Sequence, residues 1–147
     1  MADVKDPKIA EAYEKVRKND DDTMWLILDY ESDKSNALSL VKTGTGDLTD
    51  FASNLEPQRA SFGYVRVKYA NDDHSVREKF CLVIWIGEEV KIMRRAKVSV
   101  HTADVKNVLR TYSIEVSAST KGDLQEDEIV QRMRRAGGAN YDRSRFD

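Results

Sequence analysis

The chain has 147 residues, of which 40% are hydrophobic and 8% aromatic, enough to bury the core of one domain. A net charge of −2, with 34% charged residues, predicts a well-solvated surface and argues against a general nucleic-acid binder. The longest apolar run is far shorter than the roughly 20 residues that a membrane span needs, so we expect contact with neither nucleic acid nor membrane.

The single cysteine, Cys81, lies inside an apolar run and has no partner for an internal disulfide. A free cysteine in such surroundings is usually an unreactive core thiol. The chain also has no leader in which a basic stretch precedes an apolar one. These features predict a cytoplasmic protein in a reducing compartment.

The first third of the chain predicts a helix followed by a β-hairpin. Asp6 can cap the helix and Pro7 is tolerated in its first turn. One face of the helix carries an apolar stripe with helical spacing. The stripe consists of Ile9, Ala12, Tyr13 and Val16. After a polar run, residues 24–30 and 37–42 predict two strands joined by a turn.

The segment 43–46, Thr-Gly-Thr-Gly, resembles the start of a phosphate-binding loop. Thr49 stands where a third glycine is needed, however, and no Lys-Ser or Lys-Thr pair follows, so we interpret the segment as a flexible turn. It leads to a short helix over 48–55, which Pro57 ends. The apolar face of this helix consists of Leu48, Phe51, Ala52 and Leu55.

The most apolar stretch, residues 80–86, predicts a strand that is buried on both faces at the centre of a sheet. Residues 61–69 predict the preceding strand, and the polar segment 71–75 joins the two as a hairpin. A strand without a polar face needs helices above and below it. The fold class is therefore α/β (α+β), with helices on both faces of the sheet.

Two apolar stripes after Gly87 predict a long helix that is kinked or broken around residues 98–102, where Thr102 can cap the restarted half. The first stripe consists of Ile92, Ala96 and Ser99, and the second of Val105, Val108, Leu109 and Tyr112. Apolar and polar residues alternate over 114–118, which predicts a short, half-exposed strand.

A last helix is predicted from a pair that resembles a capping box, Asp123 and Glu126. Its apolar face consists of Ile129, Val130, Met133 and Ala136. The glycines at 137 and 138 end it. We therefore divide the chain into one domain, residues 1–136, and a flexible tail, residues 137–147.

The sequence offers no convergent set of catalytic groups. Nothing marks either of the two histidines, His74 and His101, as paired, and metal-ligand spacing is absent. Glu88 and Glu89 are adjacent at a strand end, so their side chains point to opposite faces. We expect neither an enzyme nor a bound metal or cofactor.

Cationic side chains bracket the apolar strand on both sides. Arg77 and Lys79 share one strand face, while Glu78 points to the other. The second group, after the strand, consists of Lys91, Arg94, Arg95 and Lys97. A basic helix face is often only solvated, but this cluster also fits an acidic partner surface. We predict that both groups form a single docking surface.

Several segments closely resemble the coactosins, which are members of the actin-depolymerising-factor homology family. These are residues 85–90 (Trp-Ile-Gly-Glu-Glu-Val), 95–97 (Arg-Ala-Lys) and 136–142 (Ala-Gly-Gly-Ala-Asn-Tyr-Asp). Ala-Tyr at 12–13 and Val-Arg at 16–17 match as well. The likeness covers almost the whole chain in the same order.

The resemblance implies the fold of that family, with a mixed sheet of five or six strands and helices on both faces. It also implies a non-enzymatic protein of the actin cytoskeleton that binds the sides of filamentous actin without severing or depolymerising it, and that opposes barbed-end capping. Two alternatives stay open, a protein that binds monomeric actin and a scaffold for another enzyme. We expect a monomer, because no large apolar stripe is left over.

The resemblance further implies where actin is contacted. The key lysine of the family precedes a phenylalanine, as Lys79 precedes Phe80 here. The implied contacts on the long helix are Met93, Arg94, Arg95 and Lys97, and those on the last helix are Arg134 and Arg135. We add Arg77, which shares the strand face of Lys79. Glu78 departs from the more basic run typical of coactosins, which leaves the affinity for filaments open.

Overall fold

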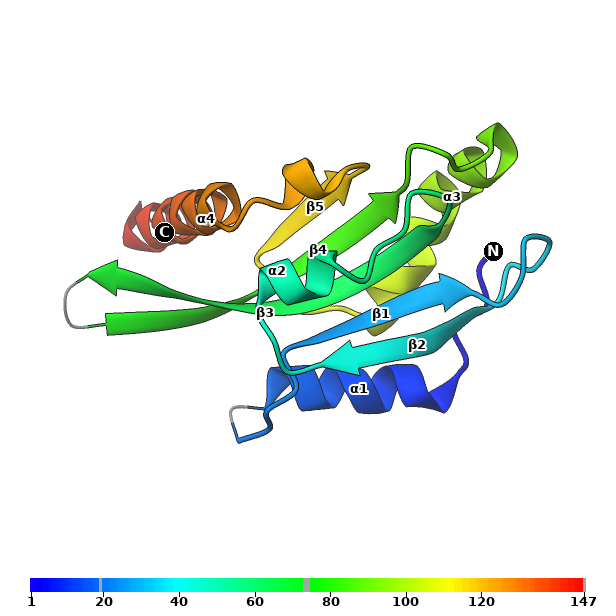
Figure 1. The fold of residues 1–147 in the computed structure, drawn as a ribbon. Helices are drawn as coiled ribbons and strands as arrows, with labels where there is room; N and C mark the ends of the chain where they lie inside the picture. The colour runs from blue at the N-terminus through cyan, green and yellow to red at the C-terminus, as the bar shows by residue number, and fades with distance from the viewer. Residues whose placement is uncertain (19, 73–74, 147) are drawn as a thin grey trace.

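The structure is a computed structural model that describes residues 1–18, 20–72 and 75–146, and the side chains of residues 1–18, 20–70 and 75–136 (Figure 1). The elements, in chain order, are α1 (Pro7–Arg17), β1 (Trp25–Tyr30), β2 (Leu38–Gly44), α2 (Leu48–Ala52), β3 (Ala60–Asp72), β4 (Ser75–Ile86), α3 (Ile92–Val108), β5 (Ile114–Ala118), the 3₁₀ helix η1 (Lys121–Leu124) and α4 (Glu126–Phe146).

The described strands form one five-stranded sheet in the order β2-β1-β3-β4-β5. Strand β4 pairs in parallel with β5, and the other neighbours are antiparallel, so the predicted mixed sheet is confirmed. The apolar stretch 80–86 belongs to β4, which is an interior strand, whereas the middle position belongs to β3.

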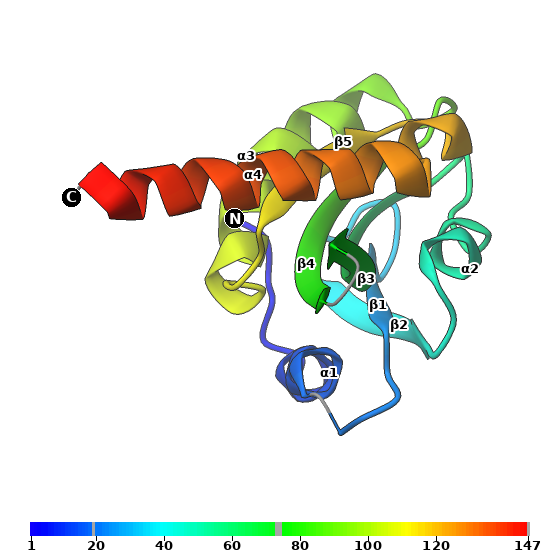
Figure 2. The same cartoon turned by 90° about the vertical axis from the view of Figure 1, so that its left-hand side faces the viewer.

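Helices cover both faces of the sheet, as Figure 2 shows when viewed nearly along the strands. Leu82 and Ile84 of β4 lie in the core under α1 and α3, while Cys81, Val83 and Trp85 lie in the core under α2, η1 and α4. This alternation confirms that the strand is buried on both faces. Cys81 is buried, which confirms a core cysteine, and this burial raises the pKa of its thiol to about 12.

The local predictions for the first half of the chain are largely confirmed. The side chain of Asp6 accepts a 3.0 Å hydrogen bond from the backbone N–H of Lys8, and the predicted apolar stripe of α1 is buried. Strands β1 and β2 form the expected hairpin, with Val41 as an extra residue in β2. Helix α2 is shorter than predicted, but all four residues of its predicted apolar face are buried.

Strands β3 and β4 extend past their neighbours as a two-stranded arm. The neighbour β1 pairs with β3 only from Ser61 to Val65, and β5 pairs with β4 only from Cys81 to Trp85. Residues 66–72 of β3 and 75–80 of β4 therefore pair only with each other among the described strands, and we call these two segments the arm. The predicted turn of this hairpin includes His74, which lies outside the described residues.

Helix α3 is continuous, so the predicted break around residues 98–102 is wrong. The hydroxyl of Thr102 donates to the carbonyl of Val98 at 2.8 Å inside the helix instead of capping a second one. The stripe predicted at Ile92, Ala96 and Ser99 is exposed, and the prediction that it faces the core is wrong. The buried face consists of Val98, His101 and Val105, continued by Leu109 beyond the helix end.

The last part of the fold corrects two predicted boundaries. Asp123 forms its capping box with Thr120 at the start of η1, not with Glu126. Helix α4 continues through both glycines to Phe146, because a glycine lowers helix propensity by only about 1 kcal/mol. The domain limit proposed at residue 136 falls inside this helix, and the flexibility of residues 137–147 stays a prediction. Strand β5 alternates between buried and exposed residues as expected.

Candidate functional site

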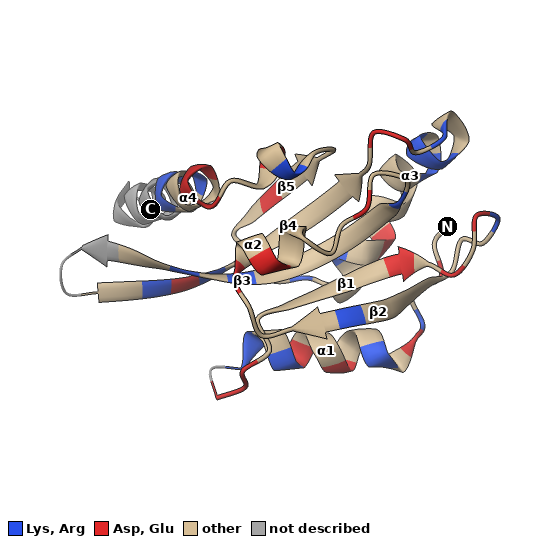
Figure 3. Cartoon of the chain, in the orientation of Figure 1, with Lys and Arg blue, Asp and Glu red and all other residues tan. Residues whose placement is uncertain are grey.

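The two cationic groups lie at opposite ends of the sheet (Figure 3), and the core clusters place them on different faces. Lys79 is seven residues before the end of β4 at Ile86, about 23 Å at 3.3 Å per residue, and α3 begins beyond that end. Lys79 also shares a strand face with Cys81, on the side that α4 covers, whereas α3 covers the other side. The prediction of a single docking surface is therefore wrong.

The first of the two surfaces, which we call the arm surface, consists of Arg77, Lys79 and Arg134. Arg135 is exposed on the same helix, and among the described residues no hydrogen bond or ion pair joins it to the arm. Helix α4 joins the arm here, because the guanidinium of Arg134 donates to the carbonyl of Ala70 at 2.7 Å and lies 5.7 Å above the ring of Tyr69. Tyr69 stands opposite Arg77 in the strand register, so the structure brings Arg77 and Arg134 together.

Glu78 does not lie on the arm surface. Its carboxylate pairs with the ammonium of Lys68 on the neighbouring strand, at 3.3 Å on the opposite face of the arm. The negative charge that interrupts the basic run is therefore directed away from Lys79 and is partly neutralised. Among the described residues, none forms a hydrogen bond or ion pair with the Lys79 side chain.

The second surface, which we call the helix surface, lies on the outer side of α3 and consists of Ile92, Met93, Ala96, Lys97 and Val100. Three of its side chains are large, apolar and unusually exposed, namely Ile92 at 83%, Met93 at 75% and Val100 at 64%. Positions 92, 96 and 100 share one side of a helix. Neighbouring exposed apolar residues of this kind mark an interaction surface.

The sequence reasoning missed Ile92 and Val100 as surface residues, although a signal was present. The residues Val98, His101, Val105 and Leu109 recur with helical spacing and define the inner face of α3. Ile92 and Val100 point to the opposite side. If residues 92–108 are treated as one unbroken helix, the spacing of apolar residues predicts both the inner, buried side and the outer, exposed side.

Arg94, predicted to contact a partner, is engaged inside the molecule. One terminal nitrogen, Nη2, donates to the carbonyls of Ser32, Asp33 and Ser35 at 3.2, 2.6 and 2.9 Å. The guanidinium also lies 3.8 Å above the ring of Tyr30. Arg94 therefore binds the β1–β2 loop.

Arg95 is engaged in a similar way on the other side of the helix start. Its Nε donates to the carbonyl of Val90 at 2.9 Å, and its Nη2 donates to the carbonyls of Glu88 and Gly87 at 2.8 and 3.4 Å. It connects α3 to the loop that follows β4. Lys97 is exposed and lies on the helix surface.

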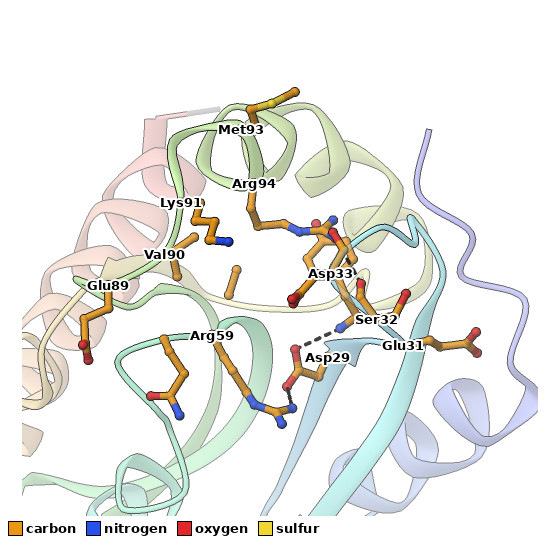
Figure 4. A pocket seen from close by; sticks show the side chains of 13 residues that line it. Asp29, Glu31, Ser32, Asp33, Arg59, Glu89, Val90, Lys91, Met93 and Arg94 are labelled. Atoms are coloured by element: carbon orange, nitrogen blue, oxygen red, sulfur yellow. Dashed lines mark hydrogen bonds and ion pairs between the residues drawn. The ribbon is translucent and has the colours of Figure 1, made fainter.

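A hollow of about 490 Å³ lies between the start of α3 and the loops after β1 and before β3 (Figure 4). Asp29 lies at its base with both carboxylate oxygens occupied, one by Arg59 at 2.8 Å and one by the backbone N–H of Tyr30 at 2.9 Å. Burial raises the pKa of Asp29, and the bond from Arg59 opposes that shift. These charges satisfy one another, so they do not form a catalytic constellation.

His101, which the sequence left unpaired, is buried against β1. Its Nδ1 lies 2.7 Å from the hydroxyl of Tyr30. Burial, the largest cause, and nearby positive charges that include Arg94 lower the pKa of His101, while Asp104 opposes them. We expect the free energy of unfolding to decrease as the pH falls through about 6.5, because the unfolded chain then gains a proton that the native histidine resists.

The measurement for this prediction is urea unfolding at about pH 7.5 and about pH 5.5, for the wild type and for His101→Gln. His101 can change the free energy of unfolding by at most about 1.4 kcal/mol per pH unit, and the variant should lack this contribution. An identical pH dependence in the variant would show that His101 does not titrate against stability.

Within the described part of the chain, no group of three or more His, Cys, Asp and Glu side chains has a geometry that could hold a metal ion. No described helix combines the length and the apolarity that crossing a bilayer requires. The arrangement that remains is a pair of candidate surfaces, one basic and one mainly apolar.

Comparisons with known proteins identify the family of this chain. The model of the family described as cofilin/tropomyosin-type actin-binding protein matches residues 1–134. Coactosin from Dictyostelium discoideum is 36% identical over 142 residues, which cover 96% of this chain and 95% of that protein. The crystal structure of coactosin from Entamoeba histolytica superposes with a TM-score of 0.83 at 26% identity, covering 93% of this chain and 97% of the other.

The solution structure of mouse coactosin is also similar, with a TM-score of 0.75 at 29% identity and 97% of both chains covered. Proteins of this family act by binding actin and are not enzymes, which confirms the expectation of a non-enzymatic protein. The chain therefore belongs to the cofilin/tropomyosin-type family of actin-binding proteins, within which it is of the coactosin type.

Proposed function

We propose that the protein binds the sides of actin filaments, neither severing nor depolymerising them, and opposes capping of their barbed ends. The helix surface docks on one actin subunit, and the arm surface contacts a neighbouring subunit. The observation that carries this proposal is the separation of the two surfaces. They lie at opposite ends of the sheet and on different faces, so one flat patch of a single partner molecule cannot cover both.

The chemistry of the surfaces supports different roles for them. Exposed methionine and aliphatic side chains at the helix surface supply the apolar centre that dominates interface energies. The arm surface supplies positive charge, which raises association rates and suits an acidic patch on a second subunit. Mouse coactosin is described as an actin filament binding protein, which favours filaments as the partner here too.

Two linked contacts strengthen each other, because once one has formed the second becomes intramolecular. A filament offers both contacts, whereas a monomer offers only one. We therefore expect Lys79→Ala to weaken binding to filaments at least about tenfold and to leave weak binding to monomeric actin unchanged. Co-sedimentation with filaments at two salt concentrations, together with native gels of monomeric actin, measures the two affinities.

The matched control is Lys68→Ala, which removes the same charge from the same arm but on the other face. The ion pair lost with Lys68 is exposed and contributes under about 1 kcal/mol to stability, so this variant should fold and pellet with filaments like the wild type. Equal pelleting of Lys79→Ala and Lys68→Ala would remove Lys79 from the site. If Lys79→Ala loses affinity for monomers and filaments equally, a monomer-binding protein is favoured instead.

A further inference from the structure

We propose that Arg94 is a positioning residue for actin binding. It holds the first two turns of α3 on the β1–β2 loop, and so keeps the helix surface in its docking orientation without touching actin itself. The inference rests on the proposed role of the helix surface, and it changes the role that the family resemblance gives to Arg94.

The first turns of α3 have no hydrophobic anchor of their own. None of the residues 91–97 is buried, and the first buried residue of the helix is Val98. Figure 1 shows that α3 begins beyond the end of β4. The N-cap residue, Lys91, makes no side-chain capping bond. Because two turns of helix are not stable alone, other contacts must hold them.

Arg95 joins these turns only to the adjacent loop, residues 87–90, whereas Arg94 connects them to the β1–β2 loop from the inner side of the helix. Residues 94, 98 and 101 share one helix face, so the side chain of Arg94 points away from the helix surface. Its guanidinium gathers three carbonyls of the β1–β2 loop and stacks on Tyr30 at the same time. All three bonds come from one nitrogen, Nη2, while the flat face of the guanidinium lies over the ring of Tyr30. An ammonium group has no flat face, so it cannot stack and donate to the loop in this way.

Tyr30 connects this contact to the body of the protein. Its ring lies between the guanidinium of Arg94 and the core, where it packs edge-on against Phe62 with ring centres 6.3 Å apart. Its hydroxyl pairs with His101, which is seven residues after Arg94 on the same helix. Two side chains of α3, two turns apart, thus hold one tyrosine of β1. This clamp fixes the helix start relative to the sheet.

A contact role and a positioning role predict different results for Arg94→Lys, which keeps the charge. If Arg94 met an acidic group of actin, the lysine would retain most of the binding. If Arg94 positions the helix, the lysine loses the planar group that stacks on Tyr30. Should the docked turns then be populated about a tenth of the time, the apparent Kd for filaments rises about tenfold. The salt dependence of binding stays as in the wild type, because no charge is removed.

Hydrogen exchange of the free protein provides the readout that a contact residue would not change. We expect the amides of residues 95–99 to exchange at least about tenfold faster in Arg94→Lys, while the amides in the middle of β3 and β4 keep their protection. Tyr30→Leu should give the same pattern, because it removes the surface on which the guanidinium stacks. Lys97→Gln is the control, since it alters the exposed side of the same turns and should leave exchange unchanged.

Two results would overturn the proposal. One is unchanged exchange in Arg94→Lys, which together with lost affinity would make Arg94 a contact. The other is faster exchange with wild-type affinity for filaments. If the wild-type protein itself fails to bind actin, the proposed function is wrong, and the exchange of residues 95–99 still decides whether Arg94 holds the helix start. The two failures are therefore distinguishable.

Discussion

Replacing Met93 with aspartate should weaken actin binding about 100-fold, in assays with filaments and with monomers alike. Met93 is 75% exposed, so the change opens no cavity and the fold should survive. The loss has two causes. The apolar contact at the centre of the helix surface is lost, and the new carboxylate must be desolvated when the interface forms. Co-sedimentation with filaments and native gels with monomeric actin measure the loss.

The control for Met93→Asp is Ala10→Asp, which adds the same charge to the exposed side of α1, away from both surfaces. It should bind actin like the wild type. Thermal unfolding of both variants tests whether the fold is intact. A loss of less than about threefold in a folded Met93→Asp protein would exclude Met93 from the centre of the interface.

Arg66→Met should lower the free energy of unfolding by about 3 kcal/mol, a large part of the 5–15 kcal/mol typical of one domain. Arg66 lies on β3 and is only 3% exposed. Its guanidinium caps the end of α1 and accounts for four backbone acceptors, the carbonyls of Lys15, Val16, Lys18 and Asp21. Methionine fills the space but removes the arginine donor from these buried and partly buried carbonyls, of which that of Lys18 still accepts from the backbone N–H of Asp21 at 3.4 Å.

Urea unfolding monitored by circular dichroism measures this loss, and Arg17→Met is the matched control at the same helix end. Arg17 is exposed, pairs with Glu14 at 3.5 Å and lies 5.2 Å above the ring of Tyr13, so its replacement should cost less than about 1 kcal/mol. If both variants lose a similar free energy of unfolding, the burial of Arg66 and its capping of α1 contribute little to stability.

The elements that were predicted well are those whose residues carry their own periodic signal. The stripe of α1, the apolar face of α2, the continuous apolar run of β4 and the alternation in β5 each follow from the spacing of apolar residues. They give the pattern of burial without any knowledge of which elements meet. The resemblance to coactosins then supplied the fold and the partner class, which the family match supports.

The errors arose where burial depends on how far another element extends. Ile92 looks like a core residue in the sequence, but it lies on the outer side of α3, and this helix begins beyond the last residue of β4, so the sheet does not extend under its first turns. The glycines at 137 and 138 look like a helix end, but the backbone continues as a helix because their effect on stability is small. Local composition contains no information about the length of the neighbouring sheet.

The single docking surface is the clearest case of this limit. Arg77, Lys79, Arg94 and Arg95 are close in sequence, and their clustering suggests a common site. An extended strand of seven residues separates the groups by about 23 Å, however, and the return of the chain as α3 brings the second group to the other face. Two surfaces result where one was expected.

The sequence by itself determined which residues are apolar at which period, and hence the class of fold, the buried Cys81 and the family of actin-binding proteins. Only the tertiary structure decided which charged groups are free and which are engaged. Arg94 and Arg66 look like any other arginine in the sequence, yet one binds the β1–β2 loop and the other caps α1. The physical reason is that their partners are backbone carbonyls, which every residue possesses and which become selective acceptors when the fold brings them together.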